Sequence, residues 1–352
     1  MAIDPVGNDA LIRLPTMTNA TTIPIINLGD SDDDIISTLG RTLSDTGFVM
    51  VQGHGISEAL LANLRQLLAT YFAQPLETKM QDCITPDNYR GYIPLGFFSP
   101  NAEGDASDHY EGYKLHFETA SHDPIRRQCD LYGTNKWPAE PIELRQAIEA
   151  FWQACDATGK RLLSLLARIM QVEESSFISQ FNKPLTNMTL LHYPPQPKDH
   201  DGFGIHPHKD IDALTLLFLD KVGGLWLQPR GQSEWTEVTA PSHNMVVNID
   251  DLMELWSGGY FVSTPHKVVN TSGKERYSFP FFMVPRHGVP SWVSYAPQAI
   301  LGRNKTQILQ TKRENNWFPK ALEIEEIILK DKNKNYLLFL NSPNNPSGQI
   351  CE

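Results

Sequence analysis

The chain has 352 residues, of which 41% are hydrophobic and 20% charged, the ordinary balance of a globular protein with a sizeable core. Its formal net charge of −11 makes nucleic acid an unfavourable partner, because an acidic surface repels phosphate backbones. The four cysteines form no CxxC pair, and no stretch is long and apolar enough to span a membrane. We therefore expect a cytoplasmic protein with reduced thiols and no membrane partner, either a monomer or a weak homo-oligomer.

The first part of the chain has the pattern of alternating short strands and helices. Residues 1–20 are expected to be an N-terminal lead, and residues 23–28 form the first apolar run of strand type. Three aspartates at 32–34 favour a helix N-terminus, and that helix is expected to end at Gly47. A second helix follows Ser57, and a long helix is predicted from about 143 to 170. We expect residues 21–186 to form a helical or mixed region packed on a core.

The pattern changes after Asn187, where short β-rich runs alternate with turn residues up to about Pro285. Many short strands at close spacing favour a sandwich or closed barrel. The predicted fold class is α+β with a mainly β core, a double-stranded β-helix (jelly roll) flanked by helices. Its core is expected at residues 187–290, with a C-terminal helix and tail at 291–352.

The stretch around residues 204–212 contains four candidate metal ligands at alternate positions. In an extended chain His206, His208, Asp210 and Asp212 could all face one site. Two histidines and one carboxylate, with other positions open, are the ligand set of non-haem Fe(II) oxygenases. A distant strand could supply His266 as the third ligand. Spacing alone does not choose among these candidates.

An arginine and a serine ten residues beyond His266 form a candidate anion site. On a strand, Arg276 and Ser278 point the same way, and together they could bind a carboxylate. The run Phe279-Pro280-Phe281-Phe282 indicates burial nearby, and a buried arginine needs an anion to offset its desolvation.

Taken together, these motifs resemble the isopenicillin-N-synthase-like branch of the 2-oxoglutarate/Fe(II)-dependent dioxygenases. The resemblance covers most of the chain and rests on motifs in the family's order. In the N-terminal half they are Ile23-Pro24-Ile25-Ile26, Gly47-Phe48, His54-Gly55-Ile56, Tyr71-Phe72 with Lys79, Arg90-Gly91-Tyr92 and Asn135-Lys136-Trp137-Pro138. In the C-terminal half they are Tyr193-Pro194-Pro195, the run from Gly204 to Gly223-Gly224-Leu225, Ser263-Thr264-Pro265-His266 and Arg276-Tyr277-Ser278.

The resemblance implies Fe(II) as the metal and 2-oxoglutarate and O2 as co-substrates. Its implied metal ligands are His208, Asp210 and His266. Arg276 and Ser278 would anchor 2-oxoglutarate, with Tyr193 nearby. The reaction would couple decarboxylation of 2-oxoglutarate to hydroxylation, desaturation or oxidative cyclisation of a small-molecule metabolite. The expected walls of the substrate pocket include Tyr92, Phe97, His116 and Phe281.

Three positions depart from the family pattern without removing a ligand. Leu191 replaces a common Asn, Lys209 replaces a common Thr between the first two ligands, and Asp250 stands where Gly is usual. Asp210 is present, which favours oxygenation over the halogenation of relatives that lack this carboxylate.

Three other functions remain open at this level. The first is an oxidase of the same fold that uses O2 without 2-oxoglutarate. The second is a zinc hydrolase with the same three ligands, although the sequence contains no HExxH helix. The third is a binding or scaffold protein that keeps the fold without catalysis.

Overall fold

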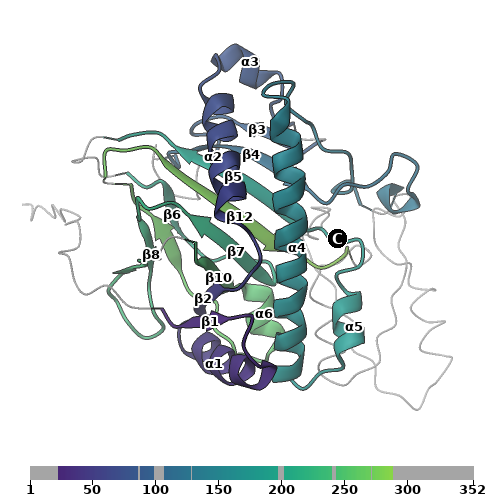
Figure 1. Cartoon of the computed structure of the whole chain (residues 1–352), viewed down its shortest axis with the longest axis vertical. Helices are drawn as coiled ribbons and strands as arrows, with labels where there is room; N and C mark the ends of the chain where they lie inside the picture. The colour runs from purple at the N-terminus through teal and green to yellow at the C-terminus, as the bar shows by residue number, and fades with distance from the viewer. Residues whose placement is uncertain are drawn as a thin grey trace, which may run out of the picture.

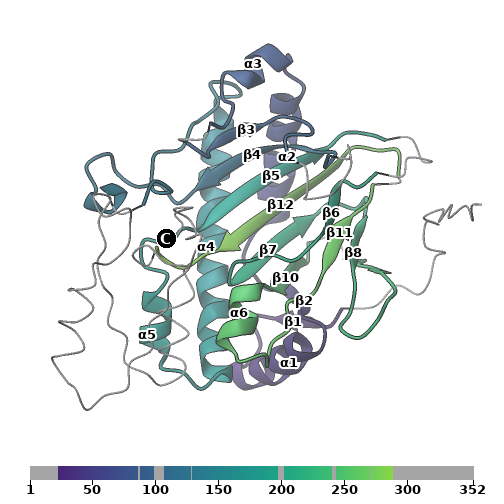
Figure 2. The ribbon, with the colours of Figure 1, turned by 180° about the vertical axis from the view of Figure 1, so that it is seen from behind.

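The computed structural model describes residues 23–85, 88–98, 107–127, 129–196, 202–239, 243–270 and 272–287. The segments expected at 1–20 and 291–352 lie outside the described residues. Two β-sheets dominate the described part of the chain, and Figure 2 shows the smaller one lying to one side of the larger.

Within the described residues, the large sheet has eight strands in the order β1-β2-β10-β7-β12-β5-β4-β3, and the small sheet has four in the order β6-β11-β8-β9. The strands before Asn187 are β1 (Ile25–Asn27), β2 (Phe48–Gln52), β3 (Gly91–Ile93) and β4 (Glu111–His116). The later strands are β5 (Asn187–Tyr193), β6 (Ile205–His208), β7 (Leu214–Leu219), β8 (Leu225–Leu227), β9 (Thr236–Glu237), β10 (Met245–Ile249), β11 (His266–Val268) and β12 (Arg276–Met283).

The centre of the large sheet is β12, which pairs antiparallel with β5 on one side and β7 on the other. These strands are buried along nearly their whole length because both of their faces are covered. The expected jelly-roll core with flanking helices is confirmed. The large sheet also reaches beyond the expected core, since β1 to β4 all precede Asn187.

Helices cover the outer face of the large sheet, as Figure 1 shows for the longest of them, α4. The helices are α1 (Asp32–Asp45), α2 (Glu58–Phe72), α3 (Leu76–Met80), α4 (Glu143–Ile169), α5 (Glu174–Ser179) and α6 (Asp251–Trp256), with a 3-10 turn at Pro124–Arg127. One stripe of α4 is buried, including Phe151, Leu162 and Leu166. It packs in one apolar core with Leu216 and Phe279 of the sheet, so α4 stiffens the strands that line the opposite face.

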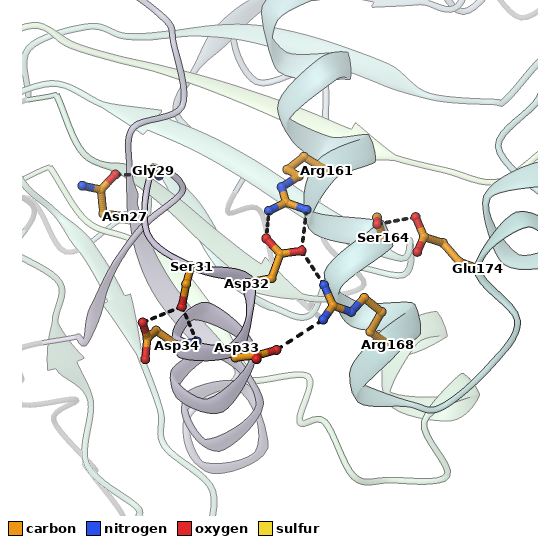
Figure 3. Close-up of polar contacts among 10 residues, drawn as sticks. All are labelled: Asn27, Gly29, Ser31, Asp32, Asp33, Asp34, Arg161, Ser164, Arg168 and Glu174. Atoms are coloured by element: carbon orange, nitrogen blue, oxygen red, sulfur yellow. Dashed lines mark hydrogen bonds and ion pairs between the residues drawn. The ribbon is translucent and has the colours of Figure 1, made fainter.

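The N-terminus of α1 is oriented against α4 by polar contacts (Figure 3). Ser31 caps the helix, since its hydroxyl oxygen accepts a hydrogen bond from the backbone N–H of Asp34 at 3.3 Å. Asp32 forms ion pairs with both Arg161 and Arg168 of α4. The hydrogen bond from Arg161 lowers the pKa of Asp32. These half-exposed pairs are screened by water, so they orient α1 while the apolar core holds it.

Candidate metal centre and binding pocket

Two histidines and a carboxylate meet at one end of the small sheet. Strand β6 ends at His208, β11 begins at His266, and the antiparallel register pairs these two residues directly. Asp210 follows β6, and its two carboxylate oxygens lie 3.7 Å from Nε2 of His208 and 3.6 Å from Nε2 of His266. One donor atom from each residue lies within 4.8 Å of the others, a spacing that suits one metal ion.

Backbone carbonyl groups orient both histidine rings. Nδ1 of His208 donates to the carbonyl oxygen of His206 at 2.7 Å, and Nδ1 of His266 donates to that of Thr264 at 3.1 Å. Because a carbonyl oxygen only accepts, each Nδ1 carries a proton, so in the neutral ring that binds a metal the lone pair is on Nε2. Burial lowers the pKa of His266, which favours the neutral imidazole that a metal requires.

Asp210 is held by side chains of the large sheet. Its Oδ2 accepts hydrogen bonds from Thr215 of β7 and Asn248 of β10, both at 3.0 Å. Burial alone would raise the pKa of Asp210, but its position beside the two histidines and these hydrogen bonds keep it below the ordinary value. The carboxylate is therefore ionised, as a metal ligand must be.

A second, buried carboxyl group lies behind Asp210. Asp250 accepts from Asn248 at 2.8 Å, and its other oxygen lies 3.0 Å from the hydroxyl of Thr215. Since Thr215 has one proton and donates it to Asp210, the bond to Asp250 requires a proton on Asp250. Burial, with the charge of Asp210, raises the pKa of Asp250 well above the ordinary value. Asp250, Thr215 and Asp210 thus form a chain of hydrogen bonds that ends at the candidate metal centre.

The other two residues of the His-x-His-x-Asp-x-Asp run are not in this cluster. The His206 ring binds Asp108, with Nδ1 lying 2.6 Å from Oδ1. Among the described residues, the group that could hold a metal contains neither His206 nor Asp212.

The predicted anion site is a buried arginine with one unused nitrogen. Arg276 is 1% exposed, and its guanidinium carbon lies 4.5 Å from the centre of the Tyr193 ring. Nε donates to the carbonyl oxygen of Gly223 at 2.7 Å, and Nη1 donates to Ser278 Oγ at 3.4 Å. Nη2 is buried and has no hydrogen-bond partner among the described residues. A buried guanidinium without a carboxylate partner fits a negatively charged ligand such as 2-oxoglutarate.

The metal cluster and Arg276 open into one cavity of about 410 Å³ between the two sheets. Its polar lining residues, apart from the three clustered ligands, are Asp108, Lys114, Thr189, His206, Thr215, Asn248, Arg276 and Ser278. Its aromatic walls are Phe48, Phe98, Tyr110, Tyr193 and Phe282. A largely apolar cavity with a few polar groups is typical of a small-molecule site.

Two residues that we predicted in the pocket wall face the other side of the sheet. Tyr92 is buried in the outer core and donates to Glu111 at 2.6 Å, while Ile93 lines the cavity. Phe281 packs against α4, and Phe282 lines the cavity. Both differences from the expected lining have one cause. Successive side chains of a strand point to opposite faces, so a shift of one residue changes the face.

The other two predicted wall residues also lie outside the cavity lining. Phe97 is 48% exposed, and its neighbour Phe98 is the lining residue. His116 is buried but does not line the cavity, whereas Lys114, two residues earlier on the same face of β4, lines it. Lys114 was not predicted, although a lysine between Tyr113 and Leu115 in a strand pattern is a signal that could have found it.

Comparisons with known proteins agree with this geometry. Residues 185–285 match the 2OG-Fe(II) oxygenase superfamily, and residues 23–140 match the family described as non-haem dioxygenase in morphine synthesis N-terminal. A 2-oxoglutarate-Fe(II) type oxidoreductase, hxnY from Emericella nidulans, is 33% identical over 72% of this chain and 75% of its own length.

The chain belongs to the 2OG-Fe(II) oxygenase superfamily. The 2-oxoglutarate-dependent dioxygenase thnC from Trichoderma harzianum is 31% identical over 74% of this chain and 83% of its own length. A 2OG-Fe(II) oxygenase family protein from Caulobacter crescentus superposes with a TM-score of 0.68 at 26% identity, covering 78% of this chain and 88% of its own. The structure of JOX2 in complex with 2OG, Fe and JA gives a TM-score of 0.66 at 27% identity, covering 82% and 86%.

The superfamily assignment favours the dioxygenase function over the oxidase, the zinc hydrolase and the non-catalytic binding protein that the sequence left open. The protein is a 2-oxoglutarate-dependent dioxygenase, an oxidoreductase that uses Fe(II) and acts on small molecules. In the described part of the chain, no helix combines the length and apolar character needed to cross a membrane.

Proposed function

We propose that His208, Asp210 and His266 hold the catalytic Fe(II), and that Arg276 with Ser278 holds 2-oxoglutarate beside Tyr193. The observation that carries this proposal is the pair of lone-pair-bearing Nε2 atoms within 3.7 Å of one ionised carboxylate. The buried, unused Nη2 of Arg276 in the same cavity supports the second part.

Bound iron and 2-oxoglutarate supply the activation of O2 and the oxidation of a C–H bond, with succinate and CO2 as co-products. The protein's own residues bind and orient these groups. Carbonyl groups keep the Nδ1 protons of His208 and His266 in place, and Thr215 with Asn248 fixes Asp210. The apolar walls limit the water near the reacting atoms.

The oxidised metabolite undergoes hydroxylation, desaturation or oxidative cyclisation in this proposal, since all three begin with removal of a hydrogen atom. We also propose a cytoplasmic protein without a nucleic-acid partner, acting as a monomer or weak homo-oligomer. The net charge of −11 and the free state of Cys83, Cys129 and Cys155 support this setting.

The metal assignment predicts a sharp division among neighbouring residues. His208→Ala, Asp210→Ala and His266→Ala should each lose stoichiometric Fe(II), measured by elemental analysis after anaerobic loading and desalting. His206→Ala is the matched control, because its ring binds Asp108 and not the cluster, and it should keep its iron. Full iron content in any of the three ligand variants would remove that residue from the site.

A further inference from the structure

A second cation faces the cavity at a distance from Arg276. Lys114 is half-buried on β4 and lines the cavity with Thr189 and Phe282. Its ammonium donates to Asn187 Oδ1 at 2.9 Å and lies 3.3 Å from Thr189 Oγ1. Both acceptors are neutral, so two of the three ammonium protons are used without neutralising the charge.

Lys114 has no ion-pair partner among the described residues. No carboxylate of the described residues lies within 4.0 Å of Nζ, although Asp212 is a more distant negative charge and aromatic rings flank the ammonium. The ring centres of Tyr89 and Phe282 lie 5.7 and 5.8 Å from Nζ, a range at which they only partly compensate the charge. The remaining donor can therefore take an anion that enters the cavity.

The strand register separates this cation from the 2-oxoglutarate site. Lys114 pairs with Thr189 and Arg276 pairs with Tyr193, so the two lie four residues apart along β5 and on opposite sides of it. Four residues span about 13 Å and two strand spacings about 10 Å, which gives roughly 16 Å between the backbones. The ammonium leans further away, toward Asn187. A five-carbon diacid held by Arg276 therefore does not reach Lys114.

The register also relates Lys114 to the metal centre. Asn187, which binds the ammonium, pairs with Phe282 of β12, and Phe282 pairs with Thr215 of β7. Thr215 in turn binds Asp210. Asn187, which binds the ammonium, and Thr215, which binds Asp210, thus lie along one row of the sheet, with their backbones about 10 Å apart across two strand spacings. The ring of Phe282 lies between them and offers an apolar surface for the body of a ligand.

We propose that Lys114 binds the carboxylate of the primary substrate, an aromatic or otherwise apolar monocarboxylic acid whose body lies over Phe282 and reaches the metal. A single lysine flanked by neutral acceptors matches one negative charge, whereas a phosphate would need more cations. This inference rests on the proposed function, because it takes the iron and 2-oxoglutarate sites as occupied.

The test compares acids with their uncharged amides. The anaerobic enzyme loaded with Fe(II) and saturated with 2-oxoglutarate is titrated by calorimetry with benzoate, phenylacetate and 3-phenylpropanoate, and with the primary amide of each. At least one acid should bind about ten- to a hundred-fold more tightly than its amide, the value of one charge-assisted hydrogen bond. Lys114→Met should abolish that preference, and Lys114→Arg should keep it.

Two further measurements keep the outcomes distinct. Lys114→Gln keeps polar contacts with Asn187 and Thr189 and serves if the methionine variant does not fold. Lys114→Met and Lys114→Gln should both bind 2-oxoglutarate with the affinity of the wild type. If no acid is preferred over its amide, or if the preference survives in Lys114→Met and Lys114→Gln, the inference is overturned. If the wild type fails to bind 2-oxoglutarate at all, the proposed function itself is wrong.

Discussion

Replacing Arg276 by lysine tests the proposed 2-oxoglutarate site without changing the charge of the side chain. The guanidinium already uses Nε on Gly223 and Nη1 on Ser278, which leaves Nη2 for the ligand. Lysine keeps the charge, but its single nitrogen cannot occupy the positions of Nε, Nη1 and Nη2 together, so at least one of these contacts is lost. Losing one charge-assisted hydrogen bond costs about 1.5–3 kcal/mol, so the 2-oxoglutarate dissociation constant should rise about ten- to a hundred-fold.

The assay is calorimetric titration of the anaerobic Fe(II) enzyme with 2-oxoglutarate. Arg276→Gln should bind more weakly still, because the carboxylate would face no opposing charge. Iron content should stay at one per chain in both variants, since Arg276 is not a proposed ligand. Arg168→Lys, a change on the half-exposed face of α4, is the matched control and should bind 2-oxoglutarate normally. Unchanged affinity in both Arg276 variants would refute the assignment.

Three further predictions concern the supports of the site. Thr215→Val removes the hydroxyl that donates to Asp210 and should weaken Fe(II) binding about ten- to a hundred-fold in a metal titration; an unchanged affinity would contradict this role. Asp250→Asn keeps both hydrogen bonds of the side chain and removes its titration. The raised pKa of Asp250 makes the wild type lose stability as pH rises above 3.8, so the free energy of unfolding of the variant relative to the wild type, measured in urea, should grow from pH 4 to pH 7. A difference that does not depend on pH would show that Asp250 is ionised in the folded protein. Burial lowers the pKa of Lys114 to about 8, so the affinity of the wild type for a carboxylate ligand should fall above pH 8. The affinity of Lys114→Arg should not fall, because arginine stays charged. If the affinities of both proteins change with pH in the same way, the role of the ammonium is contradicted. The other titratable side chains near Lys114 are Asp212, Arg90, His116 and Tyr89.

Much of the fold follows from local patterns in the sequence. The long helix predicted at 143–170 is α4 at Glu143–Ile169, and the apolar runs predicted at 214–219 and 245–249 are β7 and β10. These elements bury wide apolar faces, so their periodicity is strong. Strands β3 and β4 were not predicted, because β3 has three residues and β4 carries charged residues between its apolar positions.

The approach of His208 to His266 could be anticipated from motifs, but its supports could not. Thr215 and Asn248 reach Asp210, and Asp250 reaches Thr215, only because β7 and β10 are neighbours in the large sheet. Pairing between strands far apart in sequence is set by tertiary packing, which no local pattern encodes.

The pocket walls show a second limit, which is the choice of face. Tyr92 and Phe281 were expected in the pocket wall, whereas Ile93 and Phe282 line the cavity. In strands that are buried on both faces, alternation between polar and apolar residues disappears, so the sequence does not mark the side that faces the ligand.

The central claim is tested most directly by counting products against O2. The Fe(II) enzyme is supplied with 2-oxoglutarate, O2 consumption is followed with an electrode, and succinate is quantified at intervals. One succinate should form per O2 consumed by the wild type. In Asp210→Ala, the concentrations of O2 and succinate should both stay constant. Consumption of O2 without succinate, or succinate formation that survives in Asp210→Ala, would contradict 2-oxoglutarate-dependent oxygenation at this site.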